Sequence, residues 1–244
     1  MVRLTMLAAL QFLTRIPIRL RREPSLERTV AWFPLAGALI GAVVGGVAAG
    51  LWHLSPPLVA GAVAVTVGLL VTGAFHEDGL ADVADAFGGG WTVERRLEIL
   101  KDSRHGTYGV AAMCASIAVR IVAVGSMPGP WTMFASSIAA HAMARAAAVG
   151  LAGSLRMSSH PGLGADYGRG TTRWRAAFGV GSAVVVTVLL TGWWVGPLTA
   201  AAIVAAVGTG LLARRKIGGI SGDVLGAAEQ VAECLCLVVA VSLA

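Results

Sequence analysis

The chain has 244 residues, of which 56% are hydrophobic and 13% are charged, and its formal net charge is +6 at pH 7. The mean hydropathy is +0.76, and several apolar runs reach about twenty residues, which excludes an ordinary soluble domain. We therefore predict an all-α fold, a single polytopic membrane domain over residues 1–244 in a lipid bilayer. The basic residues lie in short loops between apolar runs and signal topology, so the positive charge does not indicate a nucleic-acid partner.

Residues 1–28 precede the first long apolar run and mix leucine, isoleucine and phenylalanine with Arg3, Arg15 and Arg19. This amphipathic, basic pattern predicts an N-terminal helix that lies in the membrane interface, broken at Pro17. About seven membrane-spanning helices follow. They are predicted at about residues 31–54, 58–75, 110–127, 131–153, 176–195, 198–213 and 224–244.

The loops between these spans differ in charge. The turns at 55–57, 128–130 and 196–197 contain no charged residue, whereas the N-terminal segment and the intervening loops carry arginine or lysine. By the positive-inside rule, the N-terminus lies in the cytoplasm and the C-terminus outside. Residues 76–109, the longest polar stretch, are then a cytoplasmic loop, and we expect the active site to face the cytoplasm.

An acidic cluster opens this loop. Asp78, Asp82 and Asp85 are spaced i, i+4 and i+7, so on a helix they share one face. Like charges at this spacing repel by about 0.2–0.5 kcal/mol per pair, and Mg²⁺ removes that repulsion because it binds carboxylates, water and substrate phosphate. Together with Glu77, these three residues are predicted to hold Mg²⁺. A merely solvated acidic loop is the alternative, but such a loop does not require helical spacing.

Other polar residues of the loop suggest a site for phosphate or nucleotide. His76 adjoins the carboxylates and is predicted to accept a proton. The alternative for the basic residues, above all for Lys101, is a surface that meets lipid headgroups. The candidates for substrate contact in this loop are Lys101, Asp102, Ser103, Arg104 and Tyr108.

Later segments add charged residues inside apolar runs. Glu229 and Glu233 are spaced i, i+4 in the last span, and intramembrane carboxylates are functional hypotheses by default. Arg145 is expected either to reach the site or to pair with Glu233. Arg120 is expected to extend toward the outer surface. Asp223 follows a glycine-rich turn, where it either contacts substrate or caps the last helix.

Six short motifs, spread over most of the chain, can be compared with those of known families. They are Leu10-Gln11-Phe12-Leu13-Thr14-Arg15-Ile16-Pro17, Phe33-Pro34-Leu35-Ala36-Gly37, Phe75-His76-Glu77-Asp78-Gly79-Leu80-Ala81-Asp82 with Asp85, Lys101-Asp102-Ser103-Arg104, Gly106-Thr107-Tyr108-Gly109 and Gly218-Gly219-Ile220-Ser221-Gly222-Asp223-Val224-Leu225-Gly226-Ala227. Together these motifs resemble those of the cobalamin synthase family, the adenosylcobinamide-GDP ribazoletransferases. At two positions, Ala86 and His105, the chain departs from the family pattern, and neither position is a carboxylate.

The resemblance implies a Mg²⁺-dependent enzyme of the bacterial inner membrane. Its substrates would be adenosylcobinamide-GDP and α-ribazole or α-ribazole 5′-phosphate, which it joins with release of GMP. A homo-oligomer remains open. From the residues and the resemblance together we assign catalysis to His76, Asp82, Lys101 and Arg104, substrate binding to Asp102, Ser103, Tyr108, Arg145 and Asp223, and the metal to Glu77, Asp78, Asp82 and Asp85.

Two other functions compete with this hypothesis. The cluster is weakly similar to the Asp-Gly-x-x-Ala motif of the CDP-alcohol phosphotransferases of lipid synthesis, but Asp78-Gly79-Leu80-Ala81 lacks one spacer residue. An ion-coupled transporter would use Glu229, Glu233, Arg145 and His141 as a path through the membrane. Transporters often show two repeated halves, and no internal repeat is evident in this chain.

Overall fold

In the computed structural model, residues 2–20, 25–155 and 170–244 are described, and within them the chain forms helices and loops without a β-strand. The predicted all-α class is confirmed. Residues 21–24 of the predicted interfacial segment and 156–169 of a basic loop lie outside the described residues. The helices are α1 (Val2–Leu13), α2 (Leu26–Thr29), η1 (Val30–Trp32), α3 (Phe33–Leu51), α4 (Pro57–Thr72), α5 (Phe75–Gly89), α6 (Val93–Ile99), α7 (Thr107–Gly125), α8 (Pro130–Ser154), α10 (Arg173–Thr191), η2 (Gly192–Trp194), α11 (Val195–Ile217) and α12 (Gly222–Leu243).

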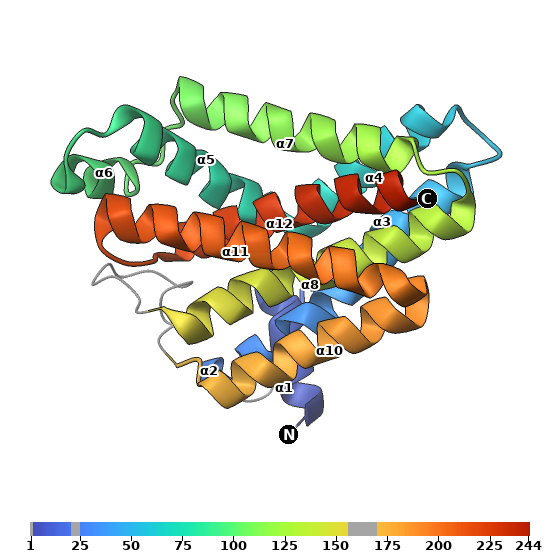
Figure 1. Ribbon diagram of the computed structural model, residues 1–244, viewed down its shortest axis with the longest axis horizontal. Helices are drawn as coiled ribbons and strands as arrows, with labels where there is room; N and C mark the ends of the chain where they lie inside the picture. The colour runs from blue at the N-terminus through green and yellow to red at the C-terminus, as the bar shows by residue number, and fades with distance from the viewer. Residues whose placement is uncertain (1, 21–24, 156–169) are drawn as a thin grey trace.

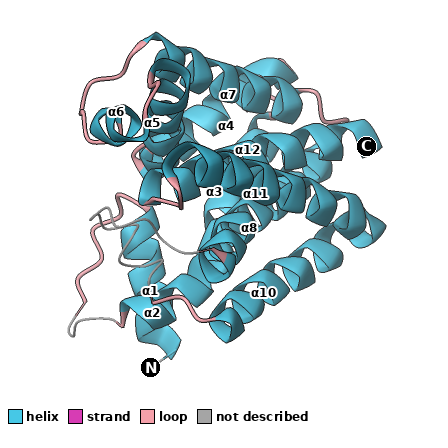
Figure 2. Cartoon of the chain, turned by 60° about the vertical axis from the view of Figure 1, so that its left-hand side comes forward, coloured by secondary structure: helices cyan, strands magenta, loops and turns pink. Residues whose placement is uncertain are grey.

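Helix α8 is the centre of the bundle, and most of its residues are buried against α3, α10, α11 and α12. Figures 1 and 2 show α5, α6 and α7 on one side of it and α10 on the other. The N-terminal helix α1 exists but ends at Leu13, where its buried side chains meet Ala36 and Ile40 of α3. Its location in a membrane interface stays a prediction.

Five helical stretches in the described chain are long and apolar enough to cross a membrane, or six if the bent pair α4–α5 counts as one span. The number of about seven spans was therefore only approximate. The stretch Arg173–Ile217 folds back at η2, so that α10 and α11 run side by side in opposite directions (Figure 1). The three uncharged turns lie together at one end of the bundle, and the loops around α6 and before α12 lie at the other.

Helices α4 and α5 meet at a break of 89°. Gly73 and Ala74 both adopt left-handed backbone conformations, with φ of 68° and 57°. Glycine adopts this conformation without cost, whereas alanine there is strained by about 1–2 kcal/mol. The predicted cytoplasmic loop 76–109 contains α5 and α6, and α5 begins inside the bundle. Thr92 caps α6, since its side chain accepts a hydrogen bond from the Arg95 amide.

A stripe of glycines lets α3 lie directly against α8. Gly37, Gly41 and Gly45 recur every four residues, and a Cβ atom added to Gly41 would lie 2.5 Å from the carbonyl oxygen of Ser137. Without a hydrophobic effect between helices inside a bilayer, such close backbone approach is the main source of packing energy. Gly46, on the outer face of the same helix, has no heavy atom within 4 Å of that position.

We expect Gly41→Leu to destabilise the bundle by about 1–3 kcal/mol, because the added side chain cannot fit against the α8 backbone. Gly46→Leu is the matched control and should unfold at the wild-type temperature. Thermal unfolding of the purified variants in detergent measures both. Equal unfolding temperatures for the two variants would show that the α3–α8 contact is looser than described.

Candidate functional site

Helix α5 runs from the interior of the bundle to its surface and carries the acidic cluster along its length. His76 and Glu77 in its first turn are buried, and Asp78 is exposed. At Gly79, a Cβ atom would lie 2.9 Å from the carbonyl oxygen of Asp223. The glycine therefore serves close packing of α5 against the start of α12, which brings a further aspartate to the cluster.

Asp78 and Asp82 face the same imidazole at the surface end of the bundle. His105 Nε2 lies 3.3 Å from Asp78 Oδ1, and His105 Nδ1 lies 3.5 Å from Asp82 Oδ1. The predicted shared face of α5 thus exists for these two residues. The negative charges of Asp78, Asp223 and Asp85 all act on Asp82, which is half-buried. We call Asp78, Asp82 and Asp223 the acidic patch.

Asp223 does not cap α12, contrary to one of its two predicted roles. Ser221 is the capping residue, because its hydroxyl accepts a hydrogen bond from the Val224 amide at 3.3 Å. Asp223 lies in the first turn of α12, where the positive end of the helix dipole favours a carboxylate. Its side chain also contacts the Ser221 hydroxyl at 3.3 Å. This position leaves Asp223 beside Gly79 and the other patch residues.

Asp85 is turned away from the patch and binds the start of α7. Its two carboxylate oxygens accept hydrogen bonds from the amides of Gly106, at 2.6 Å, and Gly109, at 2.9 Å. These amides belong to the first turn of α7, where no helical carbonyl is available to them. Asp85 therefore joins the ends of α5 and α7 across the fold. Its role as a metal ligand stays a prediction.

No group of three or more His, Cys, Asp or Glu side chains within residues 2–20, 25–155 and 170–244 is arranged to hold a metal ion. A pair of carboxylates such as Asp78 and Asp82 nevertheless suits Mg²⁺, which binds through one or two carboxylates and retains water and substrate phosphate. Glu77 is directed elsewhere, because its carboxylate lies 2.8 Å from Arg120 in the interior.

The segment between α6 and α7 carries the predicted phosphate-binding residues. Arg104 donates two hydrogen bonds to the Asp102 carboxylate, at 2.9 and 2.7 Å, and these bonds lower the pKa of Asp102 to about 2. The side chains of Lys101 and Ser103 are exposed. Tyr108 is 58% exposed, and one face of its ring covers Gly88. All these residues lie in the segment at the same end of the bundle as the acidic patch, and the neighbouring His105 contacts Asp78 and Asp82.

A second cluster of charged side chains is fully buried in the interior of the bundle. Glu233 on α12 accepts hydrogen bonds from Arg120 of α7, at 3.2 Å, and from Arg145 of α8, at 2.9 Å. His141 Nε2 lies 3.6 Å from the same carboxylate. We call Glu77, Arg120, Arg145, Glu229 and Glu233 the buried charge network.

The network connects four helices. Arg120 Nη2 lies 2.8 Å from Glu77 on α5, and Arg145 also pairs with Glu229 on α12. His76 Nδ1 lies 3.5 Å from Glu229, so this imidazole faces the network and not the patch. The prediction that Arg145 pairs with Glu233 is confirmed. The prediction that Arg120 extends outward was wrong, because its side chain is only 6% exposed and pairs inward.

Sequence reasoning missed the importance of His105 and Arg120. His105 was treated as a departure from a motif, although its position in the segment leading to α7 allows it to reach α5. For Arg120 a signal existed: the apolar run contains a single arginine, and two glutamates occur in the last span. Lone intramembrane charges usually find a partner on another helix, and counting both signs together would have predicted the pairing.

Comparisons with known proteins give one consistent family. Residues 5–241 match the family model described as cobalamin-5-phosphate synthase. A relative named adenosylcobinamide-GDP ribazoletransferase, from Ralstonia pickettii strain 12J, is 40% identical over 94% of this chain and 91% of its own length. Relatives of the same name are 39% identical in Bradyrhizobium diazoefficiens, over 95% of this chain and 91% of the relative, and 32% identical in Shewanella frigidimarina, over 95% and 91%. No solved structure matches the chain.

We expect Arg120→Met to destabilise the protein by about 3–5 kcal/mol, because Glu77 would lose its buried cationic partner. Arg95→Met is the control, since Arg95 forms an exposed pair with Glu98 on α6 and should have little effect. Thermal unfolding in detergent compares the two variants. An Arg120→Met protein as stable as the control would mean that the buried charges are neutral and need no partner.

Proposed function

Because the chain belongs to the cobalamin-5-phosphate synthase family, we propose that it joins adenosylcobinamide-GDP to α-ribazole or α-ribazole 5′-phosphate and releases GMP. The observation that supports this most directly is the match over residues 5–241, which includes every residue of the acidic patch. Several apolar helices indicate an integral membrane protein, and the relatives are bacterial. We propose the inner membrane, with the acidic patch on the cytoplasmic side.

The proposed reaction is a phosphoryl-group transfer. A ribose hydroxyl of α-ribazole forms a bond to the phosphorus linked to cobinamide. The bond between that phosphorus and the bridging oxygen of the pyrophosphate breaks, and GMP leaves with this oxygen. The hydroxyl gives up its proton during the attack. Reactions of this kind depend on positioning and on neutralising phosphate charge more than on covalent catalysis.

The acidic patch supplies oxygen ligands and a proton acceptor. We propose that Asp78 and Asp82 hold Mg²⁺, with Asp223 as a further ligand. When bound, Mg²⁺ neutralises pyrophosphate charge. We assign acceptance of the hydroxyl proton to Asp82, and His105, whose Nδ1 lies 3.5 Å from Asp82 Oδ1, would receive the proton in turn. Of the two imidazoles near the cluster, His105 replaces the predicted His76, which faces Glu229.

Basic side chains beside the patch would bind the phosphate and guanosine parts of the substrate. Lys101 and Arg104 are exposed there, and a phosphate that replaces Asp102 as the partner of Arg104 would gain a charge-assisted, bidentate contact. Ser103 and Tyr108 border the same surface. We do not assign this role to Arg145, because its side chain is buried and paired with Glu229 and Glu233.

The buried charge network does not support transport as a second function. A transporter path needs polar groups that bind and release an ion, whereas Arg120 and Arg145 are each paired with carboxylates of the network. We propose that the network orients α5, and therefore the patch, relative to α12. In this proposal Arg145, Glu229 and Glu233, which the transporter hypothesis selected, are structural supports for the enzyme site.

The reaction is tested by GMP release from adenosylcobinamide-GDP, with and without α-ribazole and Mg²⁺, using the purified protein. We expect release only when both are present. Asp82→Asn should lower turnover by at least about a hundredfold, because it weakens metal binding and removes the proton acceptor. Glu98→Gln on exposed α6 is the matched control and should retain turnover. Wild-type rates for Asp82→Asn at saturating Mg²⁺ would remove the acidic patch from the mechanism.

The orientation is tested by labelling single cysteines with an impermeant maleimide in intact cells, after replacement of Cys114, Cys234 and Cys236 by serine. Gly129→Cys lies at the end with the uncharged turns and should be labelled from outside. Gly89→Cys lies at the end of α5 and should react only after the membrane is opened. Both positions have open space for a side chain. The reverse pattern would place the acidic patch outside the cell.

A further inference from the structure

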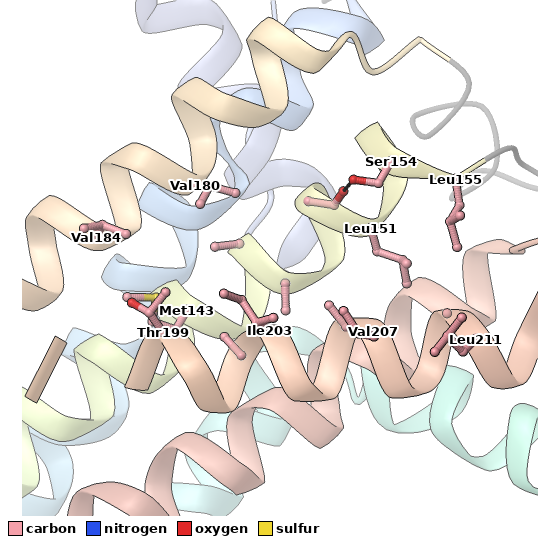
Figure 3. A pocket seen from close by; sticks show the side chains of 16 residues that line it. Met143, Leu151, Ser154, Leu155, Val180, Val184, Thr199, Ile203, Val207 and Leu211 are labelled. Carbon is pink, nitrogen blue, oxygen red and sulfur yellow. Dashed lines mark hydrogen bonds between the residues drawn. The ribbon is translucent and has the colours of Figure 1, made fainter. Parts of the chain in front are cut away.

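An apolar groove lies between α8, α10 and α11 (Figure 3). Figure 2 shows α10 on the side of the bundle away from α5. Its volume is about 400 Å³. Figure 3 shows Leu151 of α8, Val180 of α10 and Ile203 of α11 directed into it. The hydroxyl of Ser154 at one end already donates a hydrogen bond to the Gly150 carbonyl oxygen, at 2.7 Å. The groove therefore offers hydrocarbon contact over most of its surface.

Small residues account for the groove. Ala147 and Gly150 of α8 and Ala206 and Gly210 of α11 all border it, so neither helix fills the space with side chains. A Cβ atom added to Gly150 would meet only Val180, at 3.7 Å. Gly150 is thus a position where a larger side chain has room to enter the groove.

The dimensions of the groove match one acyl chain in one leaflet. It borders α11 from Thr199 to Leu211, which is about 18 Å at about 1.5 Å per residue. The hydrocarbon core of a bilayer is about 30 Å thick, so this length corresponds to about half of it. The lining is apolar, and the helices that border the groove are long and apolar enough to span the membrane. A lipid tail has both the length and the chemistry to fill it.

Two arginines extend the groove faces at the end of the bundle that carries the acidic patch. Arg214 follows Val207 by seven residues on α11, and Arg173 precedes Val180 by seven on α10. A spacing of seven residues is close to two helical turns. Each arginine therefore lies on the same face of its helix as the groove-lining valine. Both side chains are exposed. Arg175, by contrast, lies off this face and is paired with Glu27 at 2.6 Å.

We propose that the groove is a binding site for an anionic phospholipid. One acyl chain lies between α8, α10 and α11, and the positive charges of Arg214 and Arg173, at the ends of α11 and α10, attract the anionic headgroup. Basic residues at the cytoplasmic ends of adjacent membrane helices attract anionic lipids in this way. The site is separate from the acidic patch, and lipid binding does not depend on the proposed reaction.

The test is native mass spectrometry of the delipidated full-length protein with equal amounts of phosphatidylglycerol and phosphatidylcholine that carry the same acyl chains. We expect one preferred phosphatidylglycerol adduct. Arg173→Gln and Arg214→Gln should each weaken it about fivefold. Arg215→Gln is the matched control, because it removes the same charge from the next residue, whose side chain points about 100° away from that of Arg214 around α11. We expect it to leave the preference for phosphatidylglycerol unchanged.

A second variant tests the tail site independently of charge. Gly150→Leu places a side chain in the groove and should reduce the adducts of both lipids. Equal binding of the two lipids by the wild type, or equal effects of Arg214→Gln and Arg215→Gln, would overturn the proposal. A dimer that Gly150→Leu abolishes would instead assign the groove to a second copy of the chain. If Gly150→Leu does not fold, the arginine series decides the question alone.

Discussion

The double contact of Glu233 with Arg120 and Arg145 ties α12 to α7 and α8 in the interior of the bundle. Three buried carboxylates meet two guanidinium groups, so every member is stable only while the others keep their positions. Removing a charge from such a site leaves its partner unpaired in a medium that solvates it poorly. Since the five side chains come from α5, α7, α8 and α12, the network fixes those helices relative to one another.

This constraint explains how an apolar bundle presents aspartates at one end. Helix α5 has one carboxylate, Glu77, inside the network and the next, Asp78, at the surface. The break at Gly73 and Ala74 turns the chain by 89°, so α5 leaves the interior at an angle. The strained backbone of Ala74 and the burial of the Glu77–Arg120 ion pair each cost free energy, and both belong to this path of α5. They persist because the tight packing at Gly79 and the hydrogen bonds of Asp85 act on the same helix.

The sequence was sufficient to predict the helical class and the family resemblance, because both depend on hydrophobic runs and short motifs, which are local properties. It also gave the pairing of Arg145 with Glu233 as one of two alternatives, and the structure shows that pairing. Spacing on α5 did not reveal that Asp85 serves the α7 amides, since that depends on where another helix begins. The same reason applies to His105, which reaches Asp78 and Asp82 only through the path of the α6–α7 segment. Contacts between distant segments leave no periodic signal.

The acidic residues on α5 fall into two groups, according to the partners that the fold gives their carboxylates. Glu77 has Arg120, and Asp85 has two amides, so the structure already provides each of these charges with partners. Asp78 and Asp82 share only a partly exposed imidazole, and the charge of Asp223 adds to theirs. A divalent cation would relieve that repulsion, and a substrate that brings a pyrophosphate would complete its ligands. Asp78 and Asp82 are therefore the carboxylates of α5 to which we assign the proposed chemistry, whereas Glu77 and Asp85 hold the helix that presents them.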